Sequence, residues 1–353
     1  MSTSIAAAGL ACPVPAGTPD RVQLGHGSGG KMSAALLRER FLPHFGNDVL
    51  TQLGDAAVLP LGREEVALST DTFVVSPLEF PGGNIGSLAV HGTLNDVAMM
   101  GARAVCLTAG FVLEEGLDFD VLERVVATMA HAARSAGVPL VTGDTKVVER
   151  GKADGLYINT TGLGLLRPGF RPAPQRAARG DAIIVSGPLG CHGMAIMAAR
   201  EGIGFESQIE SDTAHLGPLV DRLAAAIGAE VHALRDPTRG GLASTLNEIA
   251  AASRVGMVLD EGALPVPANV QAACEMLGLD PLYVANEGVL VAILPDAHAA
   301  RAVEALRSHP VGADARVIGR VTGDHPGMVV LRTGIGGSRI VDLLPGDQLP
   351  RIC

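Results

Sequence analysis

Tryptophan is absent from this chain of 353 residues, and aromatic residues make up only 3% of it. The core therefore has to be built from Val, Leu, Ile and Ala, within an apolar fraction of 47%. Basic residues are also few, because 27 Lys and Arg stand against 37 Asp and Glu, for a net charge of -10. This charge argues against a nucleic-acid partner, since phosphate backbones bind basic faces. It does not exclude nucleotides, because a bound metal offsets the repulsion between carboxylates and phosphate.

Paired cysteine motifs are missing too, since no CxxC occurs and the cysteines are far apart. They are Cys12, Cys106, Cys191, Cys274 and Cys353. This spacing excludes a disulfide framework or a zinc site and favours a reducing cytoplasm. No apolar run reaches the roughly 18 residues of a membrane span. The Ala- and Pro-rich start lacks the basic residues of a signal peptide, so we interpret residues 1–20 as a poorly ordered leader.

The 45 glycines and 22 prolines indicate many tight turns between short elements. Strand and helix patterns recur in both halves of the chain, and the Pro-rich segment 167–174 interrupts them. The class is therefore α/β or α+β in two layers, with two domains. The expected parts are a leader (1–20), an N-terminal domain (21–166), a C-terminal domain (167–340) and a mobile tail (341–353).

Four aspartates of the first half lie at predicted turns beside Gly, Thr or Asn, namely Asp55, Asp71, Asp96 and Asp144. Asp71 and Asp144 end strand-like runs, and carboxylates at strand ends converge when the strands share a sheet. Because Mg²⁺ takes hard oxygen ligands, the set predicts a metal site against the phosphates of a nucleotide. The alternative is that Asp is common in turns for its own backbone hydrogen bonds.

A glycine-rich loop, residues 25–31, runs into the first helical pattern. Free backbone N–H groups at a helix N-terminus suit phosphate, so we predict nucleotide contacts at Gly29, Gly30 and Lys31. The loop matches neither a Walker A motif nor a dinucleotide-binding fingerprint. A flexible linker explains its glycines equally well.

Three further polar positions are candidates for the same chemistry. Arg239 lies in Asp236-Pro237-Thr238-Arg239-Gly240-Gly241, a helix start rich in capping and anion-contacting residues. Lys146 follows Asp144 by two residues, where it either neutralises charge or contacts phosphate. Glu287 precedes an apolar strand pattern at 289–294, where a carboxylate can act as a general base, although a surface turn is the alternative.

The last residue, Cys353, lies on the most mobile part of a polypeptide. Pro345, Gly346 and Pro350 precede it and exclude an ordinary helix or an inner strand. We predict a nucleophile carried on an arm that enters a pocket and leaves again. The alternative is a frayed end that happens to finish in Cys.

Taken in order, these motifs resemble the HypE family of hydrogenase maturation factors, in the aminoimidazole ribonucleotide synthetase-like superfamily. The likeness runs from about Val22 to the terminus, and its most specific element is the final Pro350-Arg351-Ile352-Cys353. The other matching motifs are His26-Gly27-Ser28-Gly29-Gly30, Gly54-Asp55-Ala56-Ala57, Ser69-Thr70-Asp71, Asn95-Asp96-Val97-Ala98-Met99-Met100-Gly101, Gly143-Asp144-Thr145-Lys146-Val147-Val148, Asp236-Pro237-Thr238-Arg239-Gly240-Gly241 and Asn286-Glu287-Gly288.

The resemblance implies two α/β domains, each a mixed sheet with helices, that form a homodimer through the N-terminal domains with ATP near the interface. It implies an enzyme that receives a carbamoyl group on its terminal thiol from the partner HypF. The enzyme then phosphorylates the carboxamide oxygen with ATP and eliminates phosphate, which leaves a thiocyanate. The cyano group passes to iron held by the HypC–HypD complex, for the NiFe hydrogenase centre.

By the same resemblance, Cys353 carries the reacting group, and Lys146 and Glu287 match positions around the reacting amide. The implied cofactors are ATP and Mg²⁺. The residues that match the family's metal and phosphate carboxylates are Asp55, Asp71, Asp96 and Asp144.

Three other functions fit part of the pattern. Selenophosphate synthetase shares the superfamily but needs a reactive Cys or selenocysteine in its glycine-rich loop, where this chain has Gly29-Gly30-Lys31. Thiamine monophosphate kinase would share the aspartates and have no use for a terminal Cys. A non-enzymatic, nucleotide-gated carrier would use Cys353 only to ferry a group, without consuming ATP.

Overall fold

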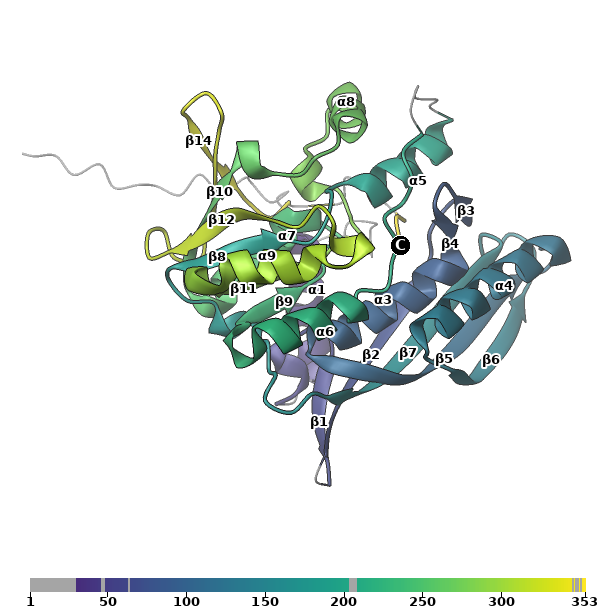
Figure 1. Ribbon diagram of the computed structural model, residues 1–353. Helices are drawn as coiled ribbons and strands as arrows, with labels where there is room; N and C mark the ends of the chain where they lie inside the picture. The colour runs from purple at the N-terminus through teal and green to yellow at the C-terminus, as the bar shows by residue number, and fades with distance from the viewer. Residues whose placement is uncertain are drawn as a thin grey trace, which may run out of the picture.

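The computed structural model describes residues 30–353 except 46–47, 63, 203–207, 345, 347–348 and 350. Over these residues it forms two large mixed sheets that carry helices, one from residues 57–166 and one from residues 181–341 (Figure 1). The C-terminus lies between the two halves. The mixed sheets with helices confirm the predicted fold class.

Within the described residues, the first sheet has five strands in the order β1-β2-β7-β5-β6. Their bounds are β1 Ala57–Leu61, β2 Glu64–Phe73, β5 Ala102–Glu114, β6 Leu140–Val148 and β7 Leu156–Leu166. Neighbours pair antiparallel except β5 and β6, which are parallel. The helical segment before this sheet comprises α1 Lys31–Leu36, η2 Leu37–Phe41 and α2 Leu42–Phe45, followed by the 3₁₀ turn η3 Leu50–Gln52.

Helix α3 (Ile85–Met99) packs on this sheet and is buried on almost every side. It follows the short hairpin of β3 (Glu79–Phe80) and β4 (Gly83–Asn84). Asn84 caps it by accepting from the Ser87 N–H at 3.2 Å, and Ser87 Oγ accepts from the Asn84 N–H at 3.1 Å, which is a capping box. A Cβ on Gly164 of β7 would lie 2.4 Å from Val97 Cγ1, so glycine permits the close contact.

Helix α4 (Phe119–Ala136) packs beside α3 on the same face of the sheet (Figure 1). Asp118 caps its first turn by accepting from the Asp120 N–H at 2.9 Å. Gly137 ends it with a φ of 69°, a left-handed conformation that favours glycine.

The second sheet, over the described residues, has seven strands in the order β14-β13-β10-β12-β8-β11-β9. Their bounds are β8 Asp181–Val185, β9 Ala233–Arg235, β10 Gly256–Asp260, β11 Val291–Pro295, β12 Arg316–Thr322, β13 Val329–Arg332 and β14 Ser338–Val341. The helices of this half are α5 Cys191–Glu201, α6 Gly217–Ala226, α7 Gly241–Ser253, α8 Ala268–Leu277 and α9 Ala299–Arg307. The 3₁₀ turns are η4 Pro174–Arg176, η5 Gly228–Glu230, η6 Glu261–Ala263, η7 Pro281–Tyr283, η8 Asp296–His298 and η9 Pro310–Gly312.

The helices of the second half cover both faces of its sheet. One apolar cluster joins α6 and α9 to β8, β9 and β11, and another joins α7 to the opposite face. A third cluster crosses between the halves, because Phe80 and Leu88 of the first half pack in it with Met194 of α5 and Ile352 of the tail. The junction between the halves is therefore a continuous core that includes the chain end.

The predicted positions of two aspartates within their strands are wrong. Asp71 lies inside β2 and Asp144 lies in the middle of β6, whereas both were expected at strand ends. Strand β6 is an edge strand with almost all of its residues exposed. Polar side chains such as those of Asp144 and Lys146 fit such a strand because solvent reaches them.

No helix in the described part of the chain is long and apolar enough to cross a membrane.

Candidate active site

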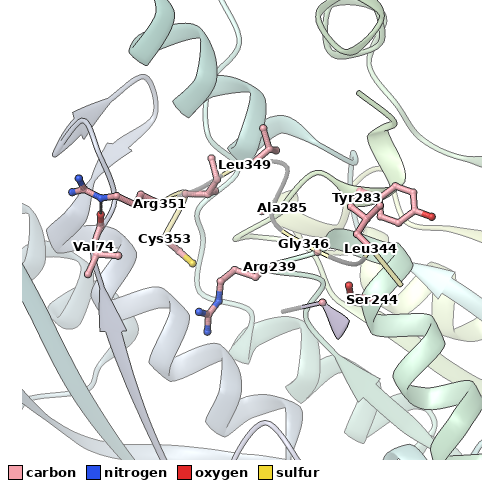
Figure 2. Close-up of a pocket in the computed structure, with 13 residues that line it drawn as sticks. Val74, Arg239, Ser244, Tyr283, Ala285, Leu344, Gly346, Leu349, Arg351 and Cys353 are labelled. Carbon is pink, nitrogen blue, oxygen red and sulfur yellow. Dashed lines mark hydrogen bonds between the residues drawn. The ribbon is translucent and has the colours of Figure 1, made fainter. Parts of the chain in front are cut away.

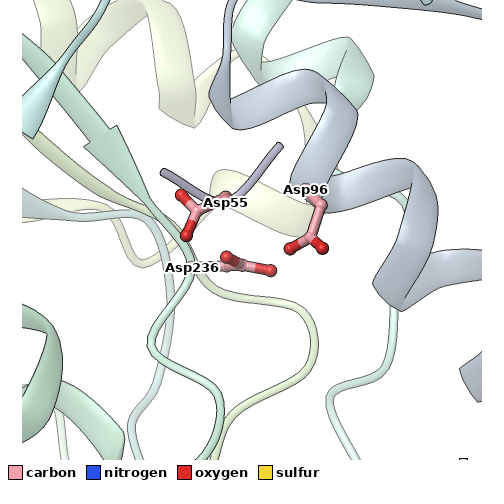
Figure 3. A group of neighbouring side chains, drawn as sticks. All are labelled: Asp55, Asp96 and Asp236. Carbon is pink, nitrogen blue, oxygen red and sulfur yellow. The ribbon is translucent and has the colours of Figure 1, made fainter. Parts of the chain in front are cut away.

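Three carboxylates meet where the two halves of the chain join. Asp55 precedes β1, Asp96 lies on α3, and Asp236 follows β9 of the second sheet. One oxygen from each lies within 4.8 Å of the others, and Figure 3 shows the three side chains turned toward one another. The cluster therefore exists only when both halves are packed together.

Neighbouring polar groups hold two of these carboxylates in place. Ser69 Oγ donates to Asp96 Oδ2 at 2.6 Å, and Arg235 Nε lies 2.5 Å from Asp55 Oδ1. The same guanidinium reaches Glu248 Oε2 at 2.8 Å. Among the described residues, the buried Oδ2 of Asp236 has no hydrogen-bond partner. A buried, unpaired carboxylate oxygen is costly and suits a cation.

Burial makes it unfavourable for these groups to be charged together. It raises the pKa of Asp55 to about 6, against the lowering effect of Arg235, and it raises the pKa of Asp236 to about 8, with the charge of Asp55 adding to the rise. The pKa of Asp96 is also raised well above its ordinary value, first by burial and then by Asp71 and Asp236. Oxygen ligands that repel one another in this way fit a hard divalent cation such as Mg²⁺.

Asp71 extends the cluster from β2. Burial raises its pKa, while a hydrogen bond with Asp96 and the charge of Arg239 lower it. Arg239 lies in the turn before α7, and its own pKa is raised first by the charge at Cys353. Acidic and basic groups of both halves thus face the same space.

That space is a cavity of about 200 Å³. Its wall combines the acidic cluster with Glu287 and with the chain end, Cys353. Figure 2 shows the Cys353 side chain beside Arg239, with Arg351 and Val74 on its other side. A terminal thiol, a buried carboxylate and candidate metal ligands therefore share one chamber.

Glu287 is buried, and its backbone is fixed by a second carboxylate. Asp212 accepts from the Glu287 N–H at 3.2 Å and from the Gly288 N–H at 3.1 Å. Asn95 of α3 donates to the Glu287 carbonyl at 3.3 Å. Gly92 of α3 lies beside the same side chain and permits a close contact with Phe73, since a Cβ there would lie 2.9 Å from Phe73 Cζ and 3.8 Å from Glu287 Oε2.

Burial raises the pKa of Glu287 well above its ordinary value. Asp236, Asp212 and Asp71 raise it further, and the charge of Arg239 lowers it. Within the described structure its Oε1 is buried without a hydrogen-bond partner. Glu287 thus lines the cavity, and its protonation depends on the charge of the acidic cluster.

Both halves of the chain match known protein families. Residues 53–166 match the family model of AIR synthase related proteins, N-terminal domain, and residues 178–331 match the corresponding C-terminal domain. The chain is 54% identical over 332 residues to the carbamoyl dehydratase HypE of Azotobacter vinelandii, which covers 94% of this chain and 97% of that protein.

The chain belongs to the HypE family of carbamoyl dehydratases. A crystal structure of the hydrogenase maturation protein HypE in complex with ATP is 50% identical, with a TM-score of 0.80, and the match covers 93% of this chain and 98% of that one. A crystal structure of a HypE–HypF complex gives a TM-score of 0.84 at 45% identity, over 88% of this chain and 100% of that one. The predicted family and its aminoimidazole ribonucleotide synthetase-like fold are confirmed.

Six of the predicted site residues of this HypE-family chain line the same cavity. They are Asp55, Asp71, Asp96, Arg239, Glu287 and Cys353. Their convergence agrees with the predicted site, and their individual roles stay predictions.

Two predicted residues lie elsewhere. Lys146 Nζ binds Asp144 Oδ2 at 2.6 Å on β6, and both side chains are 71% exposed. Three strand spacings separate β6 from β2, which is roughly 14 Å across the sheet from Asp71. The structure therefore does not bring Asp144 into the acidic cluster of its own chain.

Only the end of the glycine-rich loop, from Gly30 onward, lies within the described residues. Gly29 lies outside them, and Gly30 lines the cavity around the tail together with Cys353. Lys31 Nζ binds Asp342 Oδ2 at 2.8 Å, and its N–H donates to the Leu344 carbonyl at 3.0 Å. In this structure Lys31 thus contacts the segment that leads to the tail, and its phosphate contact stays a prediction.

Sequence reasoning missed Asp236 as a candidate metal ligand. Its signal was present, because Asp236 directly follows the strand that ends at Arg235 and precedes the motif that contains Arg239. The three-residue strand β9 is too short to show a strand period. Asp212, which orients Glu287, has no sequence signal beyond its residue type.

Proposed function

We propose that this protein dehydrates a carbamoyl group carried on Cys353 to a thiocyanate, with ATP as the phosphate donor, and so supplies the cyanide ligand of NiFe hydrogenases. The observation that carries the proposal is the single cavity that contains Cys353, Glu287 and the acidic cluster. A relative of 50% identity was crystallised in complex with ATP, which supports nucleotide binding by this chain.

The chemistry requires a poor leaving group to be replaced by a good one. The carboxamide oxygen of the S-carbamoyl group attacks the γ-phosphorus of ATP, and ADP leaves. Loss of a proton from nitrogen and cleavage of the C–O bond then release phosphate and leave the carbon triply bonded to nitrogen. Two nitrogen protons are lost in total, and the oxygen leaves in the phosphate, so the balance is one ATP for each thiocyanate.

Mg²⁺ fits the cluster of Asp55, Asp96 and Asp236, whose oxygens lie within 4.8 Å of one another. When bound, it would neutralise charge on the phosphates during transfer. Asp71 adjoins these ligands through its hydrogen bond with Asp96. Arg239, which faces both Asp71 and Cys353, is placed to bind the transferred phosphate by charge-assisted hydrogen bonds.

Glu287 is the base in this proposal. Burial and three nearby aspartates oppose its charge and raise its pKa well above the ordinary value, which favours the protonated form. Glu287 accepts a nitrogen proton as a carboxylate, and a cation held by the aspartates would favour that form by offsetting their charge. Its fixed backbone, held by Asp212, keeps the carboxyl group in place during the transfer.

The thiol needs a donor and an acceptor outside the cavity. The structure of a relative in a HypE–HypF complex supports HypF as the carbamoyl donor. We assign the HypC–HypD complex as the acceptor of the cyano group from the family resemblance. The requirement for ATP and for a free thiol favours the cytoplasm as the site of the reaction.

A homodimer through the first sheet is part of the proposal. Edge strand β6 exposes Leu140, Val141 and Val147, at 43%, 57% and 67% of their surface. A long edge with apolar side chains is a ready surface for a second copy. Asp144 and Lys146 lie on the same strand, so we assign their roles to the dimer interface, near which the family resemblance implies a bound nucleotide.

The alternatives lack support at the chain end. A thiamine monophosphate kinase or a selenophosphate synthetase has no use for a terminal thiol beside a buried carboxylate. A carrier that only ferries a group needs no base such as Glu287. Consumption of ATP during modification of the tail separates an enzyme from a carrier.

The test is the intact mass of the C-terminal peptide after incubation with the carbamoyltransferase and carbamoyl phosphate, with and without Mg-ATP. A carbamoyl adduct on Cys353 that loses one water only when ATP is present and consumed would establish the dehydratase. Cys353→Ala should bind ATP normally and show no adduct. An adduct that never dehydrates would favour the carrier, and no adduct would point to a small-molecule synthetase or kinase.

A further inference from the structure

The last residues of the chain are held by their backbone. The Val74 N–H donates to a backbone carboxylate oxygen of Cys353 at 3.1 Å, and the Ser76 N–H donates to the Arg351 carbonyl at 3.3 Å. Arg200 of α5 adds a donor to the Arg351 carbonyl at 2.8 Å. These contacts alternate along the tail, as in a short antiparallel strand pair, and leave the carbonyl of Ile352 to a different donor.

That donor is His192. Its Nε2 lies 3.0 Å from the Ile352 carbonyl oxygen, one peptide unit before the reactive thiol. The ring is fully buried in the first turn of α5, with its centroid 5.6 Å from that of Phe80 in an edge-to-face contact. A Cβ on the next residue, Gly193, would lie 2.5 Å from Val284 Cγ1, so glycine permits close packing of α5 against the segment before Glu287.

Ser211 sets the tautomer of this ring. The Thr213 N–H donates to Ser211 Oγ at 3.1 Å, so the hydroxyl proton is directed to His192 Nδ1, which lies 2.7 Å away. The proton of the neutral imidazole is then on Nε2, where it meets the Ile352 carbonyl. Burial lowers the pKa of His192 to about 4, so the ring is neutral near neutral pH.

The segment that orients His192 also orients Glu287. Asp212, between Ser211 and Thr213, accepts the backbone N–H groups of Glu287 and Gly288. Three consecutive residues therefore fix the imidazole that holds the tail and the peptide that carries the proposed base. This shared support sets the position of Cys353 relative to Glu287.

We propose that His192, oriented by Ser211, is a positioning residue that holds the chain end in the cavity and thereby places the group on Cys353 next to Glu287. The expected effect on the dehydration rate rests on the proposed function. The expected effect on how firmly the tail is held rests on the contacts alone. Both effects are measurable separately.

The experiment compares His192→Asn with His192→Gln in the full-length protein. Gln can place an amide N–H near the Nε2 position, whereas Asn is too short to reach the Ile352 carbonyl. The first readout is the rate of alkylation of Cys353 by iodoacetamide, followed by the mass of the C-terminal peptide. The second is single-turnover dehydration of the carbamoylated tail at saturating Mg-ATP.

We expect His192→Asn to alkylate about 10-fold faster and to dehydrate about 10-fold more slowly, which is the size expected from one buried hydrogen bond. His192→Gln should restore most of both rates, and the affinity for ATP should stay at the wild-type value in each variant. A merely structural defect would lower ATP affinity and would not be relieved by Gln.

Equal alkylation and dehydration rates in folded His192→Asn and wild-type protein would overturn the inference. If His192→Asn does not fold, Ser211→Ala decides instead, because it removes the hydroxyl that sets the tautomer and should give the same two changes. If wild-type protein never dehydrates the adduct, the proposed function fails, and the alkylation rates still decide whether His192 holds the tail.

Discussion

At the residue scale, the cavity holds more carboxyl groups than its cations balance. Among the described residues that line it, Arg235 and Arg239 face five carboxyl groups. These are Asp55, Asp71, Asp96, Asp236 and Glu287. Their pKa values are all raised, with burial as the first cause, so the cavity retains protons that a divalent cation can replace.

Replacing Asp96 tests whether the cluster is the metal site. Asp96→Asn keeps the shape of the side chain and removes a charged ligand, so the affinity for Mg²⁺ in ATP turnover should fall by at least about 100-fold. The measurement is turnover of ATP as a function of Mg²⁺ concentration. The exposed Asp324 offers a matched control, Asp324→Asn. An unchanged Mg²⁺ dependence in Asp96→Asn would remove Asp96 from the site.

Replacing Glu287 tests the assignment of the base. Glu287→Gln keeps the backbone contacts with Asp212, because they involve the Glu287 and Gly288 N–H groups. Loss of a general base should slow thiocyanate formation by roughly 100- to 10,000-fold while the carbamoyl adduct accumulates on Cys353. The masses of the tail peptide over time give this rate. Thiocyanate formed at the wild-type rate would dismiss Glu287 as the base.

At the element scale, long and periodic segments could be predicted from the sequence and edge segments could not. Helix α4 begins directly after its Asp118 cap and ends before Gly137, so the residues that start and stop it are adjacent to it in the sequence. Strand β6 continues through Asp144 and Lys146, although Gly-Asp-Thr is typical of a turn, because an exposed edge accepts polar residues on both faces. Convergence of the aspartates was predictable for Asp55, Asp71 and Asp96.

The contribution of the second half to the site could not be predicted in the same way. Asp236 joins Asp55 and Asp96 only because the junction core packs β9 and α3 together, and no local pattern contains that contact. The contacts of His192 with the tail span 160 positions of sequence. Such pairings depend on the packing of whole elements, which propensity and spacing do not encode.

The exposed edge of β6 leads to a prediction about self-association. Val147→Asp places a charge on a side chain that is 67% exposed in the single chain and that we expect to be buried in a dimer. The dissociation constant of the homodimer should rise at least about 10-fold in this variant, since burial of an aliphatic side chain is replaced by burial of a charge. Sedimentation measures the fractions of monomer and dimer.

The matched control for this variant is Val126→Asp, because Val126 is 44% exposed on helix α4 and does not lie on the edge strand. It should leave the association unchanged. Equal dissociation constants for Val147→Asp and wild-type protein would exclude β6 from the interface, and a wild-type monomer at all concentrations would contradict the homodimer itself.

At the scale of the whole molecule, the candidate site lies where the two halves of the chain meet. The first half supplies Asp55 and Asp96, the second supplies Asp236 and Glu287, and the tail inserts Cys353 between them. An ion pair of Arg167 with Asp221 of α6, at 2.7 Å, adds a polar contact beside the apolar junction. Cation binding at the cluster should therefore stabilise the packing of the two halves as well as the chemistry.

This coupling predicts how thermal stability depends on pH. The folded protein binds protons at Asp55 and Asp236 with pKa values of about 6 and about 8, against 3.8 ordinarily. Their contribution is present below the ordinary value and is lost as pH rises through the raised values. Without Mg²⁺, Tm should therefore fall by at least about 5 °C between about pH 5 and about pH 8.

Addition of Mg²⁺ with a non-hydrolysable ATP analogue should reverse this trend, because a bound cation replaces the protons and stabilises the ionised carboxylates. The stabilisation it gives should grow with pH. Asp236→Asn removes a group whose pKa burial raises to about 8, so its metal-free Tm should depend less on pH and should gain less from Mg²⁺. Circular dichroism follows the unfolding, since the chain has no tryptophan. If Tm depended on pH in the same way with and without Mg²⁺, the acidic cluster would not be the metal site.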